Sequence, residues 1–78
     1  MYFQDDNILY GTIGNRIKQI RMDKEYTQQQ LCEKAGISIS YLSKIEAANC
    51  DKSFSLSIIN RIANALDVDI IEFFKKGD

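Results

Sequence analysis

Apolar residues recur every three to four positions along most of this chain, which is the period of amphipathic helices. The first such face runs at i, i+4 and i+7, and its members are Ile13, Ile17 and Ile20. We expect this helix to extend from about Thr12, a good N-cap residue, to Lys24. No segment alternates apolar and polar residues as a half-buried strand does. The pattern therefore predicts an all-helical protein.

The middle of the chain predicts two short helices joined by a tight turn, the layout of a helix-turn-helix. Thr27 and Gln30 are spaced as a capping box, in which each side chain bonds a backbone N–H at the helix start. Gly36 ends that helix, because glycine adopts the left-handed conformation at little cost. Ser38 caps the next helix, which reaches about Glu46. The inward-facing residues of the pair are Leu31, Cys32, Ala35, Leu42 and Ile45.

Two further helices are expected after a loop over residues 47–54. Ser55 caps the first, and its apolar stripe consists of Leu56, Ile59, Ile62, Ala63 and Leu66. Asp69 and Glu72 are spaced as a second capping box that opens a short last helix. That helix holds more large apolar side chains than one face can bury, namely Ile70, Ile71, Phe73 and Phe74. Some of them are expected to face a partner, although a place at the bottom of the core is equally well supported for each one.

The N-terminal residues are ambiguous, because apolar side chains flank a polar run over residues 4–7. We expect residues 1–11 to form an arm that lays one or two aromatic side chains on the core, with self-association as the alternative role. Residues 12–76 would then form one compact five-helix bundle. A length of 78 residues suffices for a single domain of this kind.

Composition restricts the compartment and the chemistry of the protein. No apolar run approaches the roughly 18–20 residues that span a bilayer, and the N-terminus lacks the features of a secretory signal. We therefore expect a cytoplasmic protein with no membrane partner. In that reducing compartment, free thiols at Cys32 and Cys50 are favoured over a disulfide. With no histidine in the chain, these cysteines lack the partners of a zinc site.

The chain also lacks the residues of common catalytic sites. No histidine is present to activate a cysteine nucleophile. The glycine-containing segment 11–14 lacks the length and the lysine of a phosphate-binding loop. We expect neither enzymatic activity nor a cofactor.

The helix-turn-helix residues and their flanks resemble a known family. The matching positions are Thr27-Gln28, Leu31, Cys32, Ala35-Gly36-Ile37-Ser38, Leu42-Ser43 and Ile45-Glu46. The similarity continues on both sides and covers about residues 12–75. In these positions the chain resembles the Cro/CI (XRE-type) DNA-binding domains of lambdoid phage repressors and many bacterial regulators. The resemblance implies a lambda-repressor-like fold and sequence-specific binding of a double-stranded DNA operator by a small transcriptional regulator, with repression as the expected outcome.

The resemblance also implies roles for individual residues. Gln28 would bond a DNA phosphate, with Thr27 assisting, and the free N–H groups and dipole of a helix start favour an anion there. The helix from Ser38 would be the recognition helix in the major groove, with its first turns at the base edges. The implied contacts are Ser38, base-reading Ile39, Ser40 and Lys44, neighbouring Tyr41 and Ser43, and phosphate-binding Asn49 and Lys52 in the following loop.

The chain departs from the family pattern at several positions. Phage repressors often have glutamine where Ile39 stands, so this residue could contact a thymine methyl group but supplies no hydrogen bond to a base. The family also often has glycine near Glu25 and near Ala48. Arg21 and Glu46 occupy positions where the family often has an ion pair, and we expect them to pair rather than to remain two solvated charges.

The net charge of −1 counts modestly against a nucleic-acid binder, so the distribution of charge matters more than its sum. Arg16, Lys18 and Lys52 are expected to add positive charge to the DNA-facing side. Acidic residues gather in the C-terminal third, at Asp67, Asp69, Glu72 and Asp78. A face with so few cations would neutralise few phosphates per monomer, and binding by one domain alone would be weak.

A homodimer on a two-fold symmetric site would double the DNA contacts. Our candidates for its interface are Ile71, Phe73 and Phe74, with the N-terminal arm as a further one. The alternative function is a protein-interaction module of the same fold, of antitoxin or anti-repressor type. The exposed side of the recognition helix distinguishes the two functions, because serine, tyrosine and lysine suit DNA, whereas an apolar or acidic face suits a protein.

Overall fold

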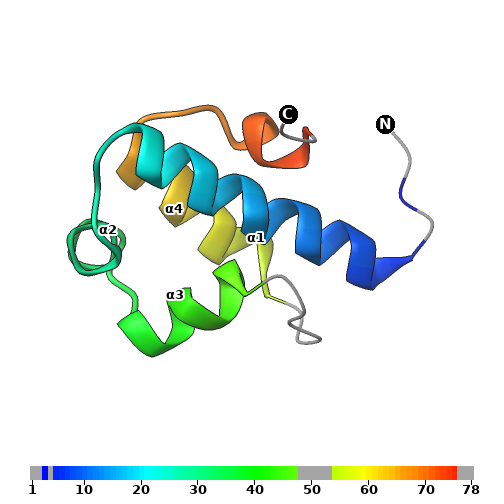
Figure 1. The fold of residues 1–78 in the computed structure, drawn as a ribbon, viewed down its shortest axis with the longest axis horizontal. Coiled ribbons are helices and arrows are strands. Elements are labelled where there is room, and N and C mark those ends of the chain that lie inside the picture. The colour runs from blue at the N-terminus through cyan, green and yellow to red at the C-terminus, as the bar shows by residue number, and fades with distance from the viewer. Residues whose placement is uncertain (1–2, 4, 48–53, 76–78) are drawn as a thin grey trace.

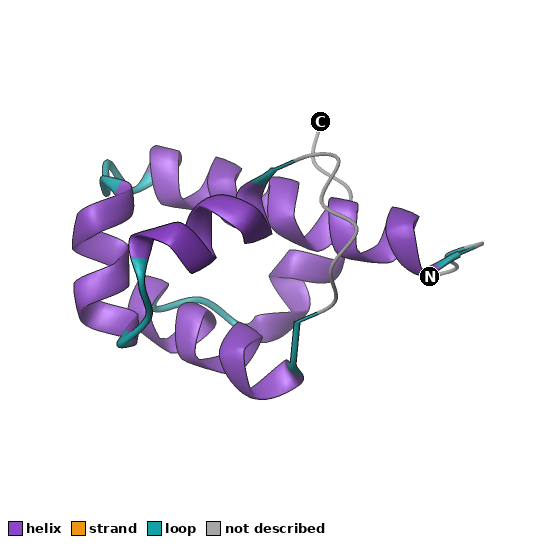
Figure 2. Cartoon of the chain, turned by 90° about the horizontal axis from the view of Figure 1, so that it is seen from below, coloured by secondary structure: helices purple, strands orange, loops and turns teal. Residues whose placement is uncertain are grey.

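The structure is a computed structural model that describes residues 3, 5–47 and 54–75 (Figure 1). Its regular elements are α1 (Asp6–Asp23), α2 (Gln28–Ala35), α3 (Ile39–Glu46), α4 (Leu56–Leu66) and the 3-10 helix η1 (Ile70–Phe74). Figure 2 shows only helices and loops in these residues, so the all-helical prediction is confirmed for them. They contain four α-helices rather than five, because the last element is a 3-10 helix.

Helix α1 is the centre of the fold. In Figure 1 it crosses the molecule between η1 on one side and α3 on the other. Its buried face contains Ile13, Ile17 and Ile20, as predicted. The largest fully buried side chains come from all five elements and are Phe73, Ile17, Leu31, Leu42, Ile45, Ile59, Ile62 and Leu66. Burial of each stabilises the fold by roughly 1.5–3 kcal/mol relative to exposure, so this core holds the four α-helices and η1 together.

Helix α1 begins earlier than the sequence analysis predicts. Its N-cap is Asp5, whose carboxylate accepts a hydrogen bond from the backbone N–H of Ile8 at 2.8 Å. The predicted start at Thr12 was wrong, because Asp5 satisfies the free N–H groups of a helix that begins upstream. The ring of Tyr10 then meets Phe54 edge to face, with centroids 4.9 Å apart. Residues 6–11 are thus helical, and a domain boundary at residue 12 stays a prediction.

The predicted caps of the central helices are confirmed. Thr27 and Gln30 form both bonds of the capping box, and the side chain of Ser38 caps α3. Gly36 ends α2 with a φ angle of 72°, in the left-handed region that glycine tolerates best. Glu25, where the family often has glycine, also lies in this region, with a φ angle of 62°.

Helices α1 and α3 approach each other closely at Gly14. This glycine is buried within α1, and a Cβ atom added to it would overlap the backbone carbonyl oxygen of Ile45. Glycine inside a helix costs roughly 0.5–1 kcal/mol relative to alanine, so the close approach of two backbones explains its presence. Gly14 therefore determines how closely the end of α3 lies against α1.

Helix α4 follows the predicted stripe except at its first residue. Ser55 caps the helix through the backbone N–H of Ile58 at 3.2 Å, as predicted. Leu56 is 69% exposed, so its assignment to the buried stripe was wrong. Asp67 ends the helix with a left-handed φ angle of 58°. The inward-facing side chains therefore begin only one turn into the helix, at Ile59.

Element η1 differs from the α-helix that was expected. Asp69 forms no side-chain cap, so the second capping box was wrong. In a 3-10 helix, residues three apart lie above one another, which places Ile70 and Phe73 on the same side. Phe73 is completely buried in the core and was wrong as a candidate for the dimer interface. Ile71 and Phe74, which are also three residues apart, share another side of η1. Ile71 is 55% exposed and Phe74 is half-buried.

Candidate nucleic-acid interface

Helix α3 buries one side and leaves the other accessible. Ser38 accepts a hydrogen bond from the backbone N–H of Tyr41 at 3.0 Å, which fixes the start of the helix. Leu42 and Ile45 then point into the core. The exposed side chains of α3 are Ile39, Ser40, Ser43 and Lys44, and Tyr41 is half-buried. This face contains hydroxyl groups, one cation and one aliphatic side chain, and none of its exposed side chains is acidic.

The start of α2 has the electrostatic character of an anion site. The backbone N–H of Thr27 donates to Gln30 Oε1 at 2.9 Å, and the backbone N–H of Gln30 donates to Thr27 Oγ1 at 3.1 Å. The N–H groups of Gln28 and Gln29 lie in the first turn, where no preceding helical carbonyl can accept from them. No acidic residue stands in this turn to compensate the helix dipole. Helix α2 therefore directs a partial positive charge outward from Gln28.

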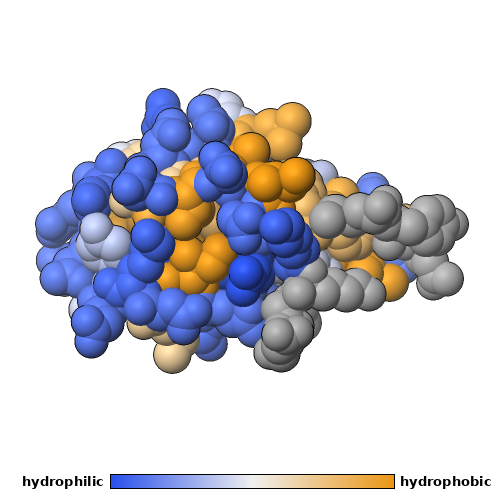
Figure 3. Space-filling model, turned by 90° about the horizontal axis from the view of Figure 1, so that it is seen from above, coloured by the Kyte–Doolittle hydropathy of each residue, from blue (hydrophilic) through white to orange (hydrophobic). Residues whose placement is uncertain are grey.

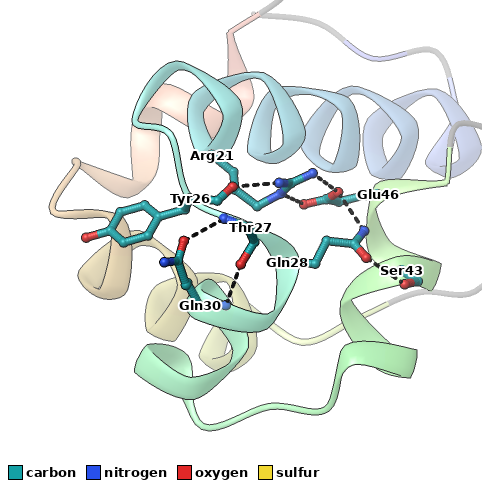
Figure 4. A network of polar contacts seen from close by, with 7 residues as sticks. All are labelled: Arg21, Tyr26, Thr27, Gln28, Gln30, Ser43 and Glu46. Carbon is teal, nitrogen blue, oxygen red and sulfur yellow. Dashed lines mark hydrogen bonds and ion pairs between the residues drawn. The ribbon is translucent and has the colours of Figure 1, made fainter.

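A buried ion pair joins α1 to the end of α3 (Figure 4). Arg21 Nε donates to Glu46 Oε2 at 2.8 Å, and Arg21 Nη2 donates to Glu46 Oε1 at 3.1 Å. Arg21 Nη1 donates to the backbone carbonyl of Tyr26 at 2.7 Å, in the turn before α2. The two residues are only 8% and 6% exposed. The expected pairing is confirmed, and the guanidinium group holds α1, the turn and α3 together.

Gln28 of α2 connects this ion pair to Ser43 on the exposed side of α3. Its Nε2 donates to Glu46 Oε1 at 3.1 Å, and its Oε1 accepts from the hydroxyl group of Ser43 at 3.2 Å. Figure 4 shows the resulting chain of contacts from Arg21 through Glu46 and Gln28 to Ser43. This connection could not be predicted from the sequence, because it depends on the angle between α2 and α3. No spacing within either helix indicates it.

The charges around α2 and α3 differ from those expected. Burial of Glu46 beside Arg21 removes one acid from the exposed surface. On α2, Lys34 Nζ donates to the hydroxyl group of Tyr26 at 3.1 Å and lies over its ring. On α3, Lys44 is the exposed cation. Arg16 was expected on the DNA-facing side and is instead paired with Glu72 of η1. Lys18 is exposed on α1, whereas Asn49 and Lys52 lie outside the described residues.

Cys32 is a packing residue next to the ion pair. Its side chain is 4% exposed and its thiol is free. Burial raises the pKa of the Cys32 thiol, the negative charge of Glu46 raises it further, and Arg21 partly opposes both effects. A thiol held in its protonated form is a poor nucleophile. This agrees with the expectation of a structural role at this position.

Two further observations concern the described residues only. No three His, Cys, Asp or Glu side chains in this part of the chain lie close enough together to hold a metal ion. None of its helices is long and apolar enough to cross a membrane.

The fold and the exposed face of α3 define the class of protein. Helices α2 and α3, joined by the turn at Gly36, form a helix-turn-helix whose second helix is accessible along one side. A family model described as helix-turn-helix matches residues 17–73. The chain belongs to this family, of the Cro/CI (XRE) type, as the resemblance in its sequence implied.

Relatives with known names share this part of the chain. The transcriptional regulator SinR of Bacillus subtilis strain 168 is 43% identical over 58 residues, which cover 74% of this chain. The immunity repressor of Bacillus phage phi105 is 44% identical over 59 residues, or 76% of this chain. The aligned regions span 51% and 40% of those two proteins, so the chain corresponds to about half of their length or less.

A solved structure shares the fold. The crystal structure of SinR, the master regulator for biofilm formation, in complex with DNA superposes with a TM-score of 0.73. It is 40% identical in sequence, and the superposition covers 81% of this chain and 98% of that one.

Proposed function

We propose that this protein binds double-stranded DNA in a sequence-specific manner and acts in the cytoplasm as a small transcriptional regulator, most simply as a repressor. The observation that carries the proposal is the exposed face of α3, with Ser40, Ser43 and Lys44 beside the uncompensated start of α2. Serine and lysine side chains suit base edges and phosphates, which favours DNA over the alternative of a protein-interaction module. The similarity to SinR in complex with DNA supports the same function.

The contacts would divide between the two helices. Gln28, with Thr27 beside it, would bind a phosphate at the start of α2. Ile39, Ser40 and Lys44 would face the major groove, where Lys44 can donate to guanine and Ile39 can contact a thymine methyl group. Further proposed contacts are Ser38, Tyr41 and Ser43 on α3, and Asn49 and Lys52 in the loop that follows.

Selection from random duplexes tests the function directly. We expect low-salt selection to enrich a defined sequence whose binding weakens steeply as salt is added. Lys44→Ala should then relax the preference at one base pair and cost about 1–3 kcal/mol on the preferred duplex. Gln28→Ala should weaken all sequences alike. A selection that enriches no sequence at low salt would overturn the proposal.

We also propose that two copies of the chain bind together, with an apolar groove as the interface. The groove has a volume of about 250 Å³ and lies between the first half of α1, the start of α4 and η1. Its lining residues are Leu9, Tyr10, Ile13, Phe54, Leu56, Ile59 and Phe74. Figure 3 shows apolar side chains at the centre and upper right of the face that carries η1, with hydrophilic ones mainly to their left. A second copy is the occupant we favour, because the few cations beside α3 leave a single domain a weak binder.

Sedimentation measurements test this interface. We expect Leu56→Glu to shift the protein toward the monomer and to weaken DNA binding, since a charge would enter the apolar contact. Met22→Glu is the matched control, because Met22 is 58% exposed but lies toward the other end of α1, outside the groove. Equal effects of the two substitutions would contradict the assignment of the interface.

A further inference from the structure

A chain of hydrogen bonds runs from Arg21 through Glu46 and Gln28 to Ser43. Its donors and acceptors are fixed at each step, because the carboxylate of Glu46 determines which group of Gln28 faces it. A carboxylate paired with a guanidinium group only accepts hydrogen bonds. Glu46 Oε1 accepts from Arg21 at 3.1 Å and from Gln28 at 3.1 Å. The group of Gln28 that faces Glu46 must therefore be its NH₂ group.

This orientation determines what Ser43 can do. With its NH₂ group toward Glu46, Gln28 turns its carbonyl oxygen to Ser43, 3.2 Å away. An amide carbonyl oxygen only accepts, so the hydroxyl group of Ser43 must be the donor. A hydroxyl group has one proton, and Ser43 uses it on Gln28. A DNA phosphate also only accepts, so Ser43 cannot bind one while this bond persists.

The amide of Gln28 is left with one N–H that is not used within this network. Its NH₂ group has two protons, of which one points to Glu46. The amide is held at both ends, by a buried carboxylate on one side and by an exposed hydroxyl group on the other. An amide held in this way loses little rotational freedom when its remaining N–H meets an acceptor.

We propose that Ser43 is a positioning residue, which holds the Gln28 amide ready for a phosphate oxygen and reads no base itself. This inference rests on the proposed function and deepens it, because it removes Ser43 from the direct contacts. It predicts that Ser43 affects affinity but not base preference. It also predicts that Ser43 has no effect once the side chain of Gln28 is absent.

A double-mutant cycle on DNA binding tests the proposal. The variants are Gln28→Ala, Ser43→Ala and the double substitution, with dissociation constants measured by fluorescence anisotropy on the selected duplex and its single-base variants. We expect Ser43→Ala to weaken binding about fivefold on every duplex, the effect of losing one hydrogen bond. In the Gln28→Ala background it should weaken binding no further. Ser43→Thr, which keeps the hydroxyl group, should restore affinity.

The matched control is Ser40→Ala on the same exposed face. Ser40 makes no hydrogen bond to Gln28 or Glu46 in the described structure, so its effect should add to that of Gln28→Ala and change the preference at one base pair. The proposal is overturned if Ser43→Ala changes base preference, or if its effect also adds to that of Gln28→Ala. Thermal melting of each variant identifies any loss that comes from unfolding. If the unsubstituted protein binds no duplex, the proposed function itself fails, which is a distinct outcome.

Discussion

Two arginines of α1 each join that helix to another element, and their surroundings differ. Arg21 contacts Glu46 of α3 through two hydrogen bonds, and both side chains are nearly buried. Arg16 lies on the side of η1, where its Nη2 is 3.8 Å from Glu72 Oε1 and the two side chains are 24% and 34% exposed. Both pairs connect segments that are distant in the sequence. Only the first is withdrawn from solvent.

The difference shows what burial does to an ion pair. Water screens and competes for the pair at Arg16, so the two charges contribute little there. At Arg21 the desolvation of both charges is balanced by hydrogen bonds, and removal of one partner leaves the other buried without compensation. The buried pair therefore determines the position of α3, and the exposed pair is only a surface contact beside η1.

The strongest test of this comparison is to remove one buried partner. We expect Glu46→Ala to lower the free energy of unfolding by about 3–5 kcal/mol, because the charge of Arg21 would stay buried without its partner. Urea denaturation followed by circular dichroism measures this change. The paired replacement Arg21→Met with Glu46→Leu should cost far less, since it removes both charges. A loss of equal size in the paired variant would contradict the role of desolvation.

A second test displaces α3 without touching the charges. Gly14→Ala should destabilise the fold by about 1–3 kcal/mol, because the added methyl group meets the carbonyl of Ile45 and forces the helices apart. The substitution should also weaken the Arg21–Glu46 contact. To separate the two effects, the loss of stability caused by Gly14→Ala is measured again in the variant that carries Arg21→Met and Glu46→Leu. Asn15→Ala, at an exposed position of the same helix, is the control. If Gly14→Ala were as stable as the original protein, the close approach would not constrain α3.

The exposed pair should give the smaller response to substitution. Glu72→Gln removes the ion pair with Arg16 and the one with Lys75 at 3.0 Å, but leaves the backbone carbonyl that accepts from Arg16 Nε. We expect the free energy of unfolding to fall by less than about 1 kcal/mol. The loss should shrink further in high salt. A loss as large as that of Glu46→Ala would mean that exposure does not separate the two pairs.

The smallest effect is expected from the pH dependence of Cys32, which lies beside the buried pair. Its folded-state pKa is raised above the ordinary value of 9.0, so the unfolded chain releases this proton first as the pH rises. The stabilisation that is linked to the raised pKa of Cys32 is thus complete below pH 9.0 and is lost as the pH rises toward the folded-state pKa. Urea denaturation at neutral and alkaline pH should show a steeper loss for the original protein than for Cys32→Ala. Identical pH profiles would contradict this.

The sequence predicts the helix-turn-helix well because its signals are local. A capping box lies within one turn, and the left-handed conformation at Gly36 depends on that residue alone. The buried positions of α1 follow from the helical period in the same way. Each of these features depends on residues a few positions apart, which a linear pattern contains.

Features that depend on distant segments were missed. The bonds of Gln28 to Glu46 and Ser43 arise from the packing of α2 against α3, and the role of Gly14 arises from the approach of α3 to α1. Phe73 was a candidate for the dimer interface as well as for the core, because an α-helix places it differently from the 3-10 helix that forms. In each case the tertiary contacts decide between local alternatives that the pattern leaves open.

The third hydrogen bond of Arg21, to the carbonyl of Tyr26, has a thermodynamic consequence for binding. The same guanidinium group fixes the end of α1, the turn before α2 and the end of α3. These segments are therefore already ordered in the free protein, and association with a partner requires no coupled folding of them. These three segments should then contribute to the heat-capacity change on binding only through the surface that they bury at the interface, without the larger negative contribution of a folding segment.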